Sequence, residues 1–290
     1  GFGPPRMQEA GRQALATVLQ RLGDDKAAIP MLRAAIADIE NGYEKYYPDH
    51  AALSAHLARM TGETKDIEAE IHILAEARKT DSGPFINMYY AGQAAQLHEM
   101  NGANNLALAE ARTAVQILSN QPTPIIYGAA AARLRLAKLA LYAEGDDATT
   151  DEQIDEILGP LKESAGETQD TVEALMIRSR LENIRGDRSA ALQSLSSAEA
   201  MLDRLGQTKT WPQTWRLYVL RAETLTLSGQ REEAMAELAR ASTLAPEKAE
   251  PRMKLARAIV EDKPFRPDET LPDESLFTID LHGLQPEAPN

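Results

Sequence analysis

Apolar residues recur three and four positions apart along most of the chain, which is the spacing of a single buried face on an α-helix. Four segments share one version of this pattern, in which two alanines flank a central leucine or alanine. Alanine at such positions lets a neighbouring helix approach closely. The four triplets are Ala28, Leu32 and Ala35; Ala107, Ala111 and Ala114; Ala191, Leu195 and Ala198; and Ala234, Leu238 and Ala241.

A glycine precedes each triplet by five residues, and the same glycine spacing continues between the triplets. A glycine at this place suits the left-handed position that ends a preceding helix. The pattern therefore predicts units of helix, tight turn and helix that repeat about every forty residues. The glycines are Gly23, Gly62, Gly102, Gly145, Gly186 and Gly229, spaced by 39, 40, 43, 41 and 43 residues.

Side chains near the glycines predict where the second helix of each unit begins. Asp24, Asn104 and Asp187 can cap a helix with a side-chain oxygen. The turn after Gly145 is longer, and there Thr150 with Gln153 has the spacing of a capping box. The pattern of residues around the turn glycine matches closely in four of the repeat units. The match is weaker in the units around Gly62 and Gly145.

The pattern predicts thirteen helices and no convincing strand. Leu255 and Ala256 mark a last helix without a partner, which we expect to cap the stack. We assign residues 5–262 to one helical repeat domain. Residues 263–290 form a proline- and acid-rich tail, extended or disordered, whose nearest strand-like stretch is Leu276 to Leu284.

Composition narrows the classes of function. The 290 residues carry a formal net charge of −13, which argues against direct binding to nucleic acid, because such proteins need a basic surface. There is no cysteine, so disulfides and thiolate metal sites are absent. The most apolar run, Ile125 to Ala143, is interrupted by three basic residues, and we predict no transmembrane segment. Localisation stays open, with the cytoplasm favoured over a periplasmic or membrane-anchored soluble domain.

The sequence contains no recognisable catalytic, metal-binding or cofactor-binding motif. The five histidines have no ligand spacing, and no nucleophile elbow, phosphate loop or zinc-binding helix motif is present. We therefore predict no enzyme activity in this segment and no cofactor or metal. Trp211 and Trp215 are the only tryptophans, and we expect them to pack between units, with a helix starting near Pro212, rather than to form an exposed anchor.

The stretch SGQREEAMAELARASTLAP, from Ser228 to Pro246, resembles the second half of a tetratricopeptide repeat. The resemblance implies an all-α, right-handed superhelical solenoid of about six repeats with a capping helix, whose first helices line a concave groove. It also implies docking of a protein or peptide. The standard repeat has ~34 residues, and the longer period here resembles kinesin light chains and the solenoid arms of bacterial signalling proteins and regulators. Helical repeats of other types, at ~40–47 residues, are the structural alternative.

Positions beside the packing residues of the first helices are candidates for partner binding. Amides, tyrosines and arginines there can hydrogen-bond a peptide backbone or a carboxylate. The simpler interpretation is a solvated helix face. Gln13 and Thr17 stand where some repeat proteins of this family clamp a carboxylate, but no full clamp is present. The candidates are Tyr89, Gln93, Gln96, Arg135, Tyr142, Arg180, Asn183 and Arg216.

Three functions fit these observations. The first is a non-catalytic scaffold that binds a protein or peptide partner in the groove and serves complex assembly. The alternative is a regulatory sensor arm of a larger signalling or transcription protein, which responds to a peptide or small ligand. The third is a structural spacer or an arm for homodimer formation.

Overall fold

The structure is a computed structural model, and it describes most of the repeat region. Within the described part, the chain forms helices and no strand, so the protein is an all-α repeat solenoid. The remaining predicted helices, before Gly23 and before Gly62, lie largely outside the described residues, as do the tail 263–290 and its strand-like stretch. The described residues are 12, 15–16, 19, 24–42, 53–54, 57, 67–79, 83–121, 128–141, 147–158, 168–246 and 249–261.

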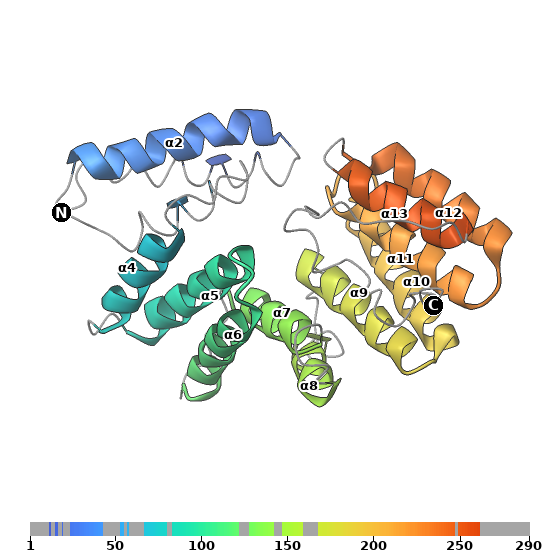
Figure 1. Ribbon diagram of the computed structural model, residues 1–290, viewed down its shortest axis with the longest axis horizontal. Helices are drawn as coiled ribbons and strands as arrows, with labels where there is room; N and C mark the ends of the chain where they lie inside the picture. Colours follow the sequence, from blue (N-terminus) through green and yellow to red (C-terminus); the bar gives the residue numbers. More distant parts are fainter. Residues whose placement is uncertain are drawn as a thin grey trace, which may run out of the picture. The chain divides into compact units, whose positions relative to one another are not determined.

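The chain divides into two larger compact units, each of which contains several helices. The first of these units comprises residues 1–139 and 210–212. In this unit α5 packs most extensively against α6, and α6 also packs against α7 while α4 packs against α5 (Figure 1). Consecutive helices are thus neighbours in space, as expected of stacked hairpins. The helices are α2 (Asp25–Gly42), α4 (Ile67–Lys79), α5 (Pro84–Met100), α6 (Asn104–Ser119) and α7 (Ala129–Leu139).

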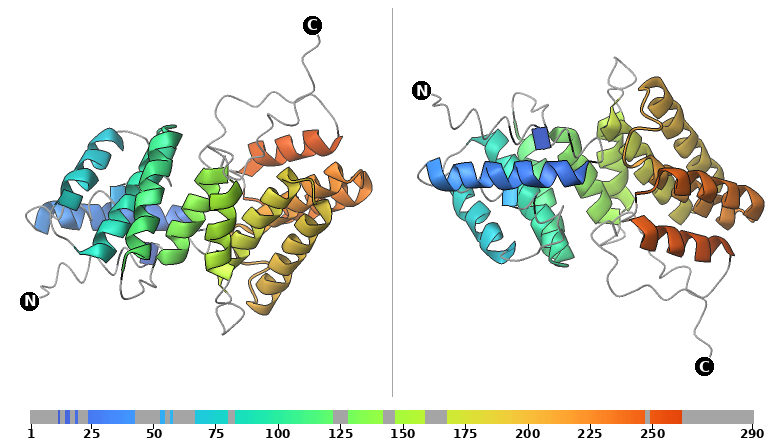
Figure 2. Two further views of the ribbon diagram at one scale, coloured as in Figure 1. Left: turned by 90° about the horizontal axis from the view of Figure 1, so that it is seen from below. Right: turned by 90° about the horizontal axis from the view of Figure 1, so that it is seen from above.

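The second unit comprises residues 140–209 and 213–290. Its hairpins are α9 with α10 and α11 with α12, and α13 packs on both α11 and α12 (Figure 2). The predicted last helix is therefore present and closes this series of described helices. The helices are α8 (Asp147–Leu158), α9 (Gln169–Ile184), α10 (Arg188–Arg204), α11 (Thr214–Leu227), α12 (Arg231–Leu244) and α13 (Glu250–Glu261).

The turn glycines have the backbone conformation that the repeat pattern predicts. Gly102, Gly186 and Gly229 have φ angles of 71°, 83° and 77°. In each turn the residue after the glycine donates its N–H to a carbonyl five residues earlier, as Gln230 does to Leu225 at 2.9 Å. This bond closes the end of the first helix and sends the chain back as the second helix. Gly23, Gly62 and Gly145 lie outside the described residues.

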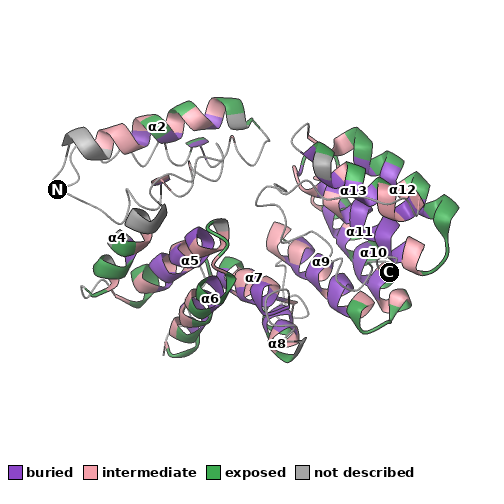
Figure 3. Ribbon diagram, in the orientation of Figure 1, coloured by how far each residue is buried: buried purple, intermediate pink, exposed green. Residues whose placement is uncertain are grey.

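The predicted packing face is confirmed in all four segments. Every alanine and leucine of the four triplets has a side chain at most 2 % exposed. Figure 3 shows buried positions concentrated in stripes along the helices, most densely on α5, α9 and α11. The short side chains at these places allow the helices of a hairpin to lie close together, which is why alanine rather than leucine dominates the pattern.

Two of the predicted helix caps form and two do not. Asp24 and Asp187 each accept a hydrogen bond at 3.0 Å from the backbone N–H three residues later. Asn104 is instead the first residue of α6, and Ala103 stands at the cap position without a side-chain bond.

The Thr150 and Gln153 capping box is wrong, because α8 already begins at Asp147. Both side chains lie inside the helix and are buried, at 0 % and 3 % exposed. They share a face with Ile154 and Ile157, which are also buried. Burial of this whole face extends the helix one turn before the predicted start.

The two tryptophans pack in the interior, as predicted. Trp211 and Trp215 are 7 % and 2 % exposed. The helix does not start at Pro212, however. α11 begins at Thr214, so only Trp215 is helical, and Trp211 lies in the preceding turn.

Candidate partner-binding site

Two of the predicted residues of the first unit contact each other across neighbouring helices. Arg135 on α7 forms an ion pair with Glu99 on α5, with Nη1 and Oε2 2.9 Å apart. Its Nη2 donates to Oε1 of Gln96 at 3.3 Å. Gln96 is buried, and the Glu99 side chain is only 9 % exposed. Arg135 therefore links two first helices through partners on α5.

The other predicted residues of this unit have different environments. Tyr89 packs partly buried against the cluster of Leu74, Tyr90, Ala94 and Leu97, and so contributes to the core. Gln93 follows one helical turn later and is partly buried. Tyr142, Gln13 and Thr17 lie outside the described residues.

The second unit contains a buried cluster of three charged side chains from three first helices. Glu223 on α11 lies between Arg180 on α9 and Arg252 on α13. Arg180 Nη1 is 3.3 Å from Glu223 Oε2, and Arg252 Nη2 pairs with Glu223 Oε1. The three side chains are between 4 % and 10 % exposed. Each carboxylate oxygen of Glu223 thus has an arginine of its own.

Asn183 extends this contact between α9 and α11. Its Nδ2 donates to Thr224 Oγ1 at 2.7 Å, and the Thr224 hydroxyl donates to the carbonyl of Leu220 at 2.9 Å. The Oδ1 of Asn183 and the Nη1 of Arg252 are both buried without a hydrogen-bond partner. Such atoms are uncommon in folded proteins, because an unsatisfied buried polar group costs about 1–3 kcal/mol.

Arg216, the remaining candidate, lies near the start of α11. Its guanidinium carbon is 5.4 Å from the centre of the neighbouring Trp215 ring, and the residue is partly buried. It therefore stacks on a buried aromatic side chain, which restricts its movement.

Three charged residues of these contacts were not among the sequence candidates: Glu99, Glu223 and Arg252. The repeat register contains a signal for Glu223, because Gln96, Arg180 and Glu223 all stand six residues before their turn glycine. Glu99 and Asn183 likewise share the position three residues before theirs. Arg252 has no such signal, since α13 is not followed by a turn glycine in the pattern.

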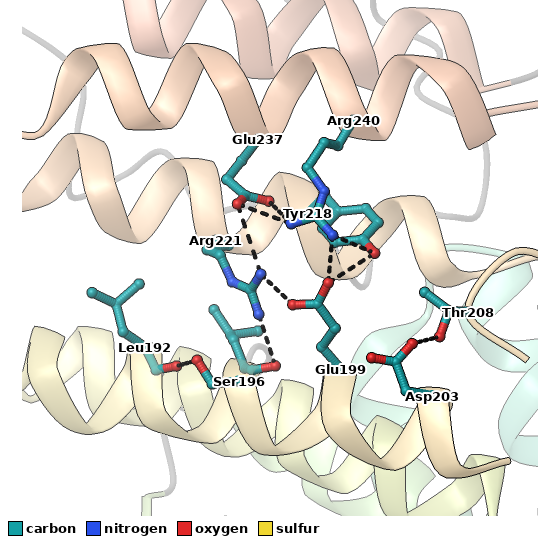
Figure 4. A network of polar contacts seen from close by, with 10 residues as sticks. Leu192, Ser196, Glu199, Asp203, Thr208, Tyr218, Arg221, Glu237 and Arg240 are labelled. Carbon is teal, nitrogen blue, oxygen red and sulfur yellow. Dashed lines mark hydrogen bonds and ion pairs between the residues drawn. The ribbon is translucent and has the colours of Figure 1, made fainter. Parts of the chain in front are cut away.

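A second polar network of this unit joins α10, α11 and α12 (Figure 4). Glu199 on α10 accepts from Arg221 at 2.6 Å and from Arg240, and it accepts from the Tyr218 hydroxyl at 3.1 Å. Arg240 also lies over the Tyr218 ring, with 4.1 Å between the guanidinium carbon and the ring centre. Glu237 pairs with both arginines. The network holds the hairpin of α11 and α12 against α10.

Burial and charge shift the pKa values within this network. Burial disfavours ionisation of Glu199, but the hydrogen bonds from Arg221 and Arg240 outweigh it and hold its pKa below the ordinary value. Burial, together with the Glu199 carboxylate, raises the pKa of Tyr218 to about 12. Tyr218 therefore stays protonated at neutral pH, where its hydroxyl can donate to Glu199.

Comparisons with known proteins identify the fold. The structure aligns with the crystal structure of BtubC (BKLC) from P. vanneervenii at a TM-score of 0.56, with 14 % identity over 93 % of this chain and 97 % of that one. It aligns with a tetratricopeptide repeat protein from Parabacteroides merdae at a TM-score of 0.51, with 17 % identity over 93 % and 98 % of the two chains. The fold is that of a tetratricopeptide repeat protein.

The likeness lies in the fold and not in close sequence relationship. No protein-family model matches the sequence, and no curated protein is significantly similar to it. The comparisons therefore show a TPR-like fold of helical repeats.

Two further findings concern the part of the TPR-like fold that the structure describes. No group of three or more histidine, aspartate or glutamate side chains there is placed to hold a metal ion. None of the described helices is long and apolar enough to cross a membrane.

Proposed function

We propose that this protein is a non-catalytic scaffold that binds a protein or peptide through the polar face of its first helices. The TPR-like fold supports a scaffold role. The repeat register supports the choice of face, because the candidate residues stand beside the packing positions of the first helices. The repeat domain, residues 5–262, would carry this function, with the tail 263–290 outside it.

The observation that carries the proposal is the cluster of Arg180, Glu223 and Arg252. Burying an ion pair costs desolvation energy, and well-packed apolar residues of similar volume often stabilise a fold equally well or better. Stability alone therefore does not explain why three charged side chains from α9, α11 and α13 are buried together. A guanidinium and an amide with unused hydrogen-bonding capacity are suited to recognition of a polar peptide group.

The proposal is tested by affinity capture from lysate of the native organism, with quantitative mass spectrometry. Because Glu223 keeps Arg252 as a partner, Arg180→Ala removes one cation without leaving the carboxylate unpaired. We expect this variant to capture about tenfold less of the specific partner, corresponding to the loss of one charge-assisted hydrogen bond. Arg135→Ala tests the corresponding contact of the first unit separately.

Arg240→Ala is the matched control, because it removes an arginine that is equally paired with a carboxylate but stands on a second helix. Its capture should equal that of the wild type. Circular dichroism and thermal melting verify that all variants fold. Undiminished capture by both Arg135→Ala and Arg180→Ala, with folding intact, would refute the proposed face.

A further inference from the structure

The polar network of α10, α11 and α12 holds the guanidinium of Arg240 with side chains from all three helices (Figure 4). Its Nη2 pairs with Glu199 on α10 and donates to the Tyr218 hydroxyl on α11 at 3.0 Å. Its Nη1 lies 3.2 Å from Oε1 of Glu237 on α12, and its central carbon lies 4.1 Å from the centre of the Tyr218 ring. Carboxylates and an aromatic face are the groups that recognise a guanidinium. Glu199, Tyr218 and Glu237 therefore form a guanidinium site.

The two arginines of the network differ in how far solvent reaches them. The Arg221 side chain is 11 % exposed, and it also donates to the Leu195 carbonyl of α10 at 3.2 Å. The Arg240 side chain is 46 % exposed. The guanidinium site is therefore open to solvent where Arg240 enters it, whereas Arg221 belongs to the buried part of the network.

Further carboxylates flank the guanidinium site on both second helices. Asp203 stands four residues after Glu199 on α10, and Glu233 stands four residues before Glu237 on α12. Residues four apart share one face of a helix, and Asp203 and Glu233 are both exposed. This surface, in a chain with a formal net charge of −13, is complementary to a positively charged segment.

The guanidinium of another molecule can replace that of Arg240 without loss of any contact in the site. The incoming group pairs with the same carboxylates and covers the same ring. Arg221 stays on Glu199 throughout, so no buried charge loses its partner. Exposed ion pairs hold their side chains weakly, because solvent screens them. Arg240 is thus a tethered occupant that a better-placed arginine displaces.

We propose that Glu199, Tyr218 and Glu237 form a docking site for an arginine of a partner protein, which Arg240 occupies in the free chain. The partner presents this arginine in a segment of net positive charge. Arginine fits better than lysine, because its planar fork reaches both carboxylates while its flat face covers the ring. The site is separate from the polar face of the first helices, and so it adds a second contact beyond the proposed function.

The substitution Arg240→Ala empties the site and leaves the other side chains in place. The probe is a blocked peptide, acetyl-Ala-Ala-Arg-Ala-Ala-amide, titrated into the full ¹⁵N-labelled chain. Analogues with lysine or citrulline in place of the arginine are its controls. We expect saturable shifts of the backbone amides of Glu199 and Glu237 in this variant, with each analogue binding at least about tenfold more weakly. Thermal melting verifies that the variant folds.

Displacement of Arg240 is measured in the wild type, at the arginine Nε–Hε signals. Arg240→Ala identifies the Arg240 signal by its loss. We expect the arginine peptide to bind the wild type about tenfold more weakly than the variant, because the tethered arginine competes for the site. As the peptide binds, the Arg240 signal should move toward the position of solvent-exposed arginines.

Neutral substitutions on α12 separate the site from the overall charge. In the Arg240→Ala chain, Glu237→Gln removes one of the two carboxylates and should weaken the arginine peptide about tenfold. Glu232→Gln is the matched control, because it removes the same charge from an exposed position of the same helix. It should bind the peptide as the Arg240→Ala chain does.

Four results would overturn the docking site. Three of them are no saturable binding by Arg240→Ala, equal affinity for the arginine and lysine peptides, and equal effects of Glu237→Gln and Glu232→Gln. The fourth is an Arg240 signal that stays fixed in the wild type at peptide concentrations about a hundredfold above the dissociation constant of Arg240→Ala.

The docking site and the proposed function are tested independently. Arg135→Ala and Arg180→Ala should bind the arginine peptide as the wild type does, because neither residue belongs to the site. Capture from lysate follows the partner of the first-helix face, so Arg240→Ala remains its control. Loss of capture in Arg180→Ala with no peptide binding leaves the proposed function standing and refutes only the docking site.

Discussion

Glu182 shows how a single half-buried carboxylate makes stability depend on pH. It lies on α9 and accepts a hydrogen bond from the Ser194 hydroxyl on α10 at 2.8 Å. Burial raises the pKa of Glu182 above 4.5, although the hydrogen bond from Ser194 and the charge of Arg178 act in the opposite direction. The folded state therefore binds the proton more tightly than the unfolded chain does.

The sign of this shift predicts that Glu182→Gln is more stable than the wild type at pH 7. Ionised Glu182 opposes folding at neutral pH, whereas a neutral glutamine can still accept from Ser194. As the pH falls through the raised pKa toward 4.5, the wild type recovers this stability, and the difference between the two proteins should shrink. Urea unfolding between pH 4 and pH 8 measures it.

Glu232→Gln is the control for Glu182→Gln, because Glu232 is exposed in the first turn of α12. It removes the same negative charge from a chain with a formal net charge of −13. A gain at pH 7 that is equal in both variants would assign the effect to the overall charge and contradict the assignment to burial.

At the level of elements, the glycines of turns and helices have opposite roles. Gly229 has a φ of 77°, where a side chain is strained whatever the space around it. Gly92 lies inside α5, and no atom stands within 4 Å of a Cβ added there. Gly229→Ala should lower the free energy of unfolding by about 1–2 kcal/mol. Gly92→Ala should raise it by about 0.5–1 kcal/mol, because alanine is the better helix former. Chemical unfolding of the two variants measures both changes, and a gain from Gly229→Ala would contradict the turn geometry.

The close contact of helices within a hairpin depends on alanine. Ala234 and Ala191 are fully buried on α12 and α10. Arginine at either position overpacks the contact and buries a charge, which should cost about 1–3 kcal/mol or more. Thermal melting checks the prediction, with Ala236→Arg and Ala200→Arg as controls at exposed positions of the same helices. Unchanged melting at both buried positions would contradict the repeat register.

At the scale of the whole molecule, charge limits the choice of partners. The formal net charge of −13 makes association with a phosphate backbone unfavourable. We expect no binding of a 20-base-pair duplex or a 20-nucleotide single strand at 150 mM salt, measured by fluorescence anisotropy. Saturable binding that weakens steeply with added salt would reveal a local basic surface and contradict this expectation.

The sequence by itself determined the repeat architecture. Its period, its turn glycines and its alanine faces follow from local backbone geometry and from the 3.6-residue period of the helix, and both are legible in a single chain. The same register identified Arg180, Asn183 and Gln96 as candidates beside the packing face. Helix starts were less predictable, since burial of Thr150 beside Ile154 and Ile157 overrode a local capping signal.

Only the tertiary structure decided which charges meet. Glu223 pairs with residues 43 positions before it and 29 positions after it along the chain, and these pairings depend on how α9, α11 and α13 pack. Arg252 stands on a helix without a turn glycine, so no repeat register pointed to it. The sequence specifies local periodicity, whereas the pairing of side chains between repeats depends on how the helices pack, and that packing exists only in the folded chain.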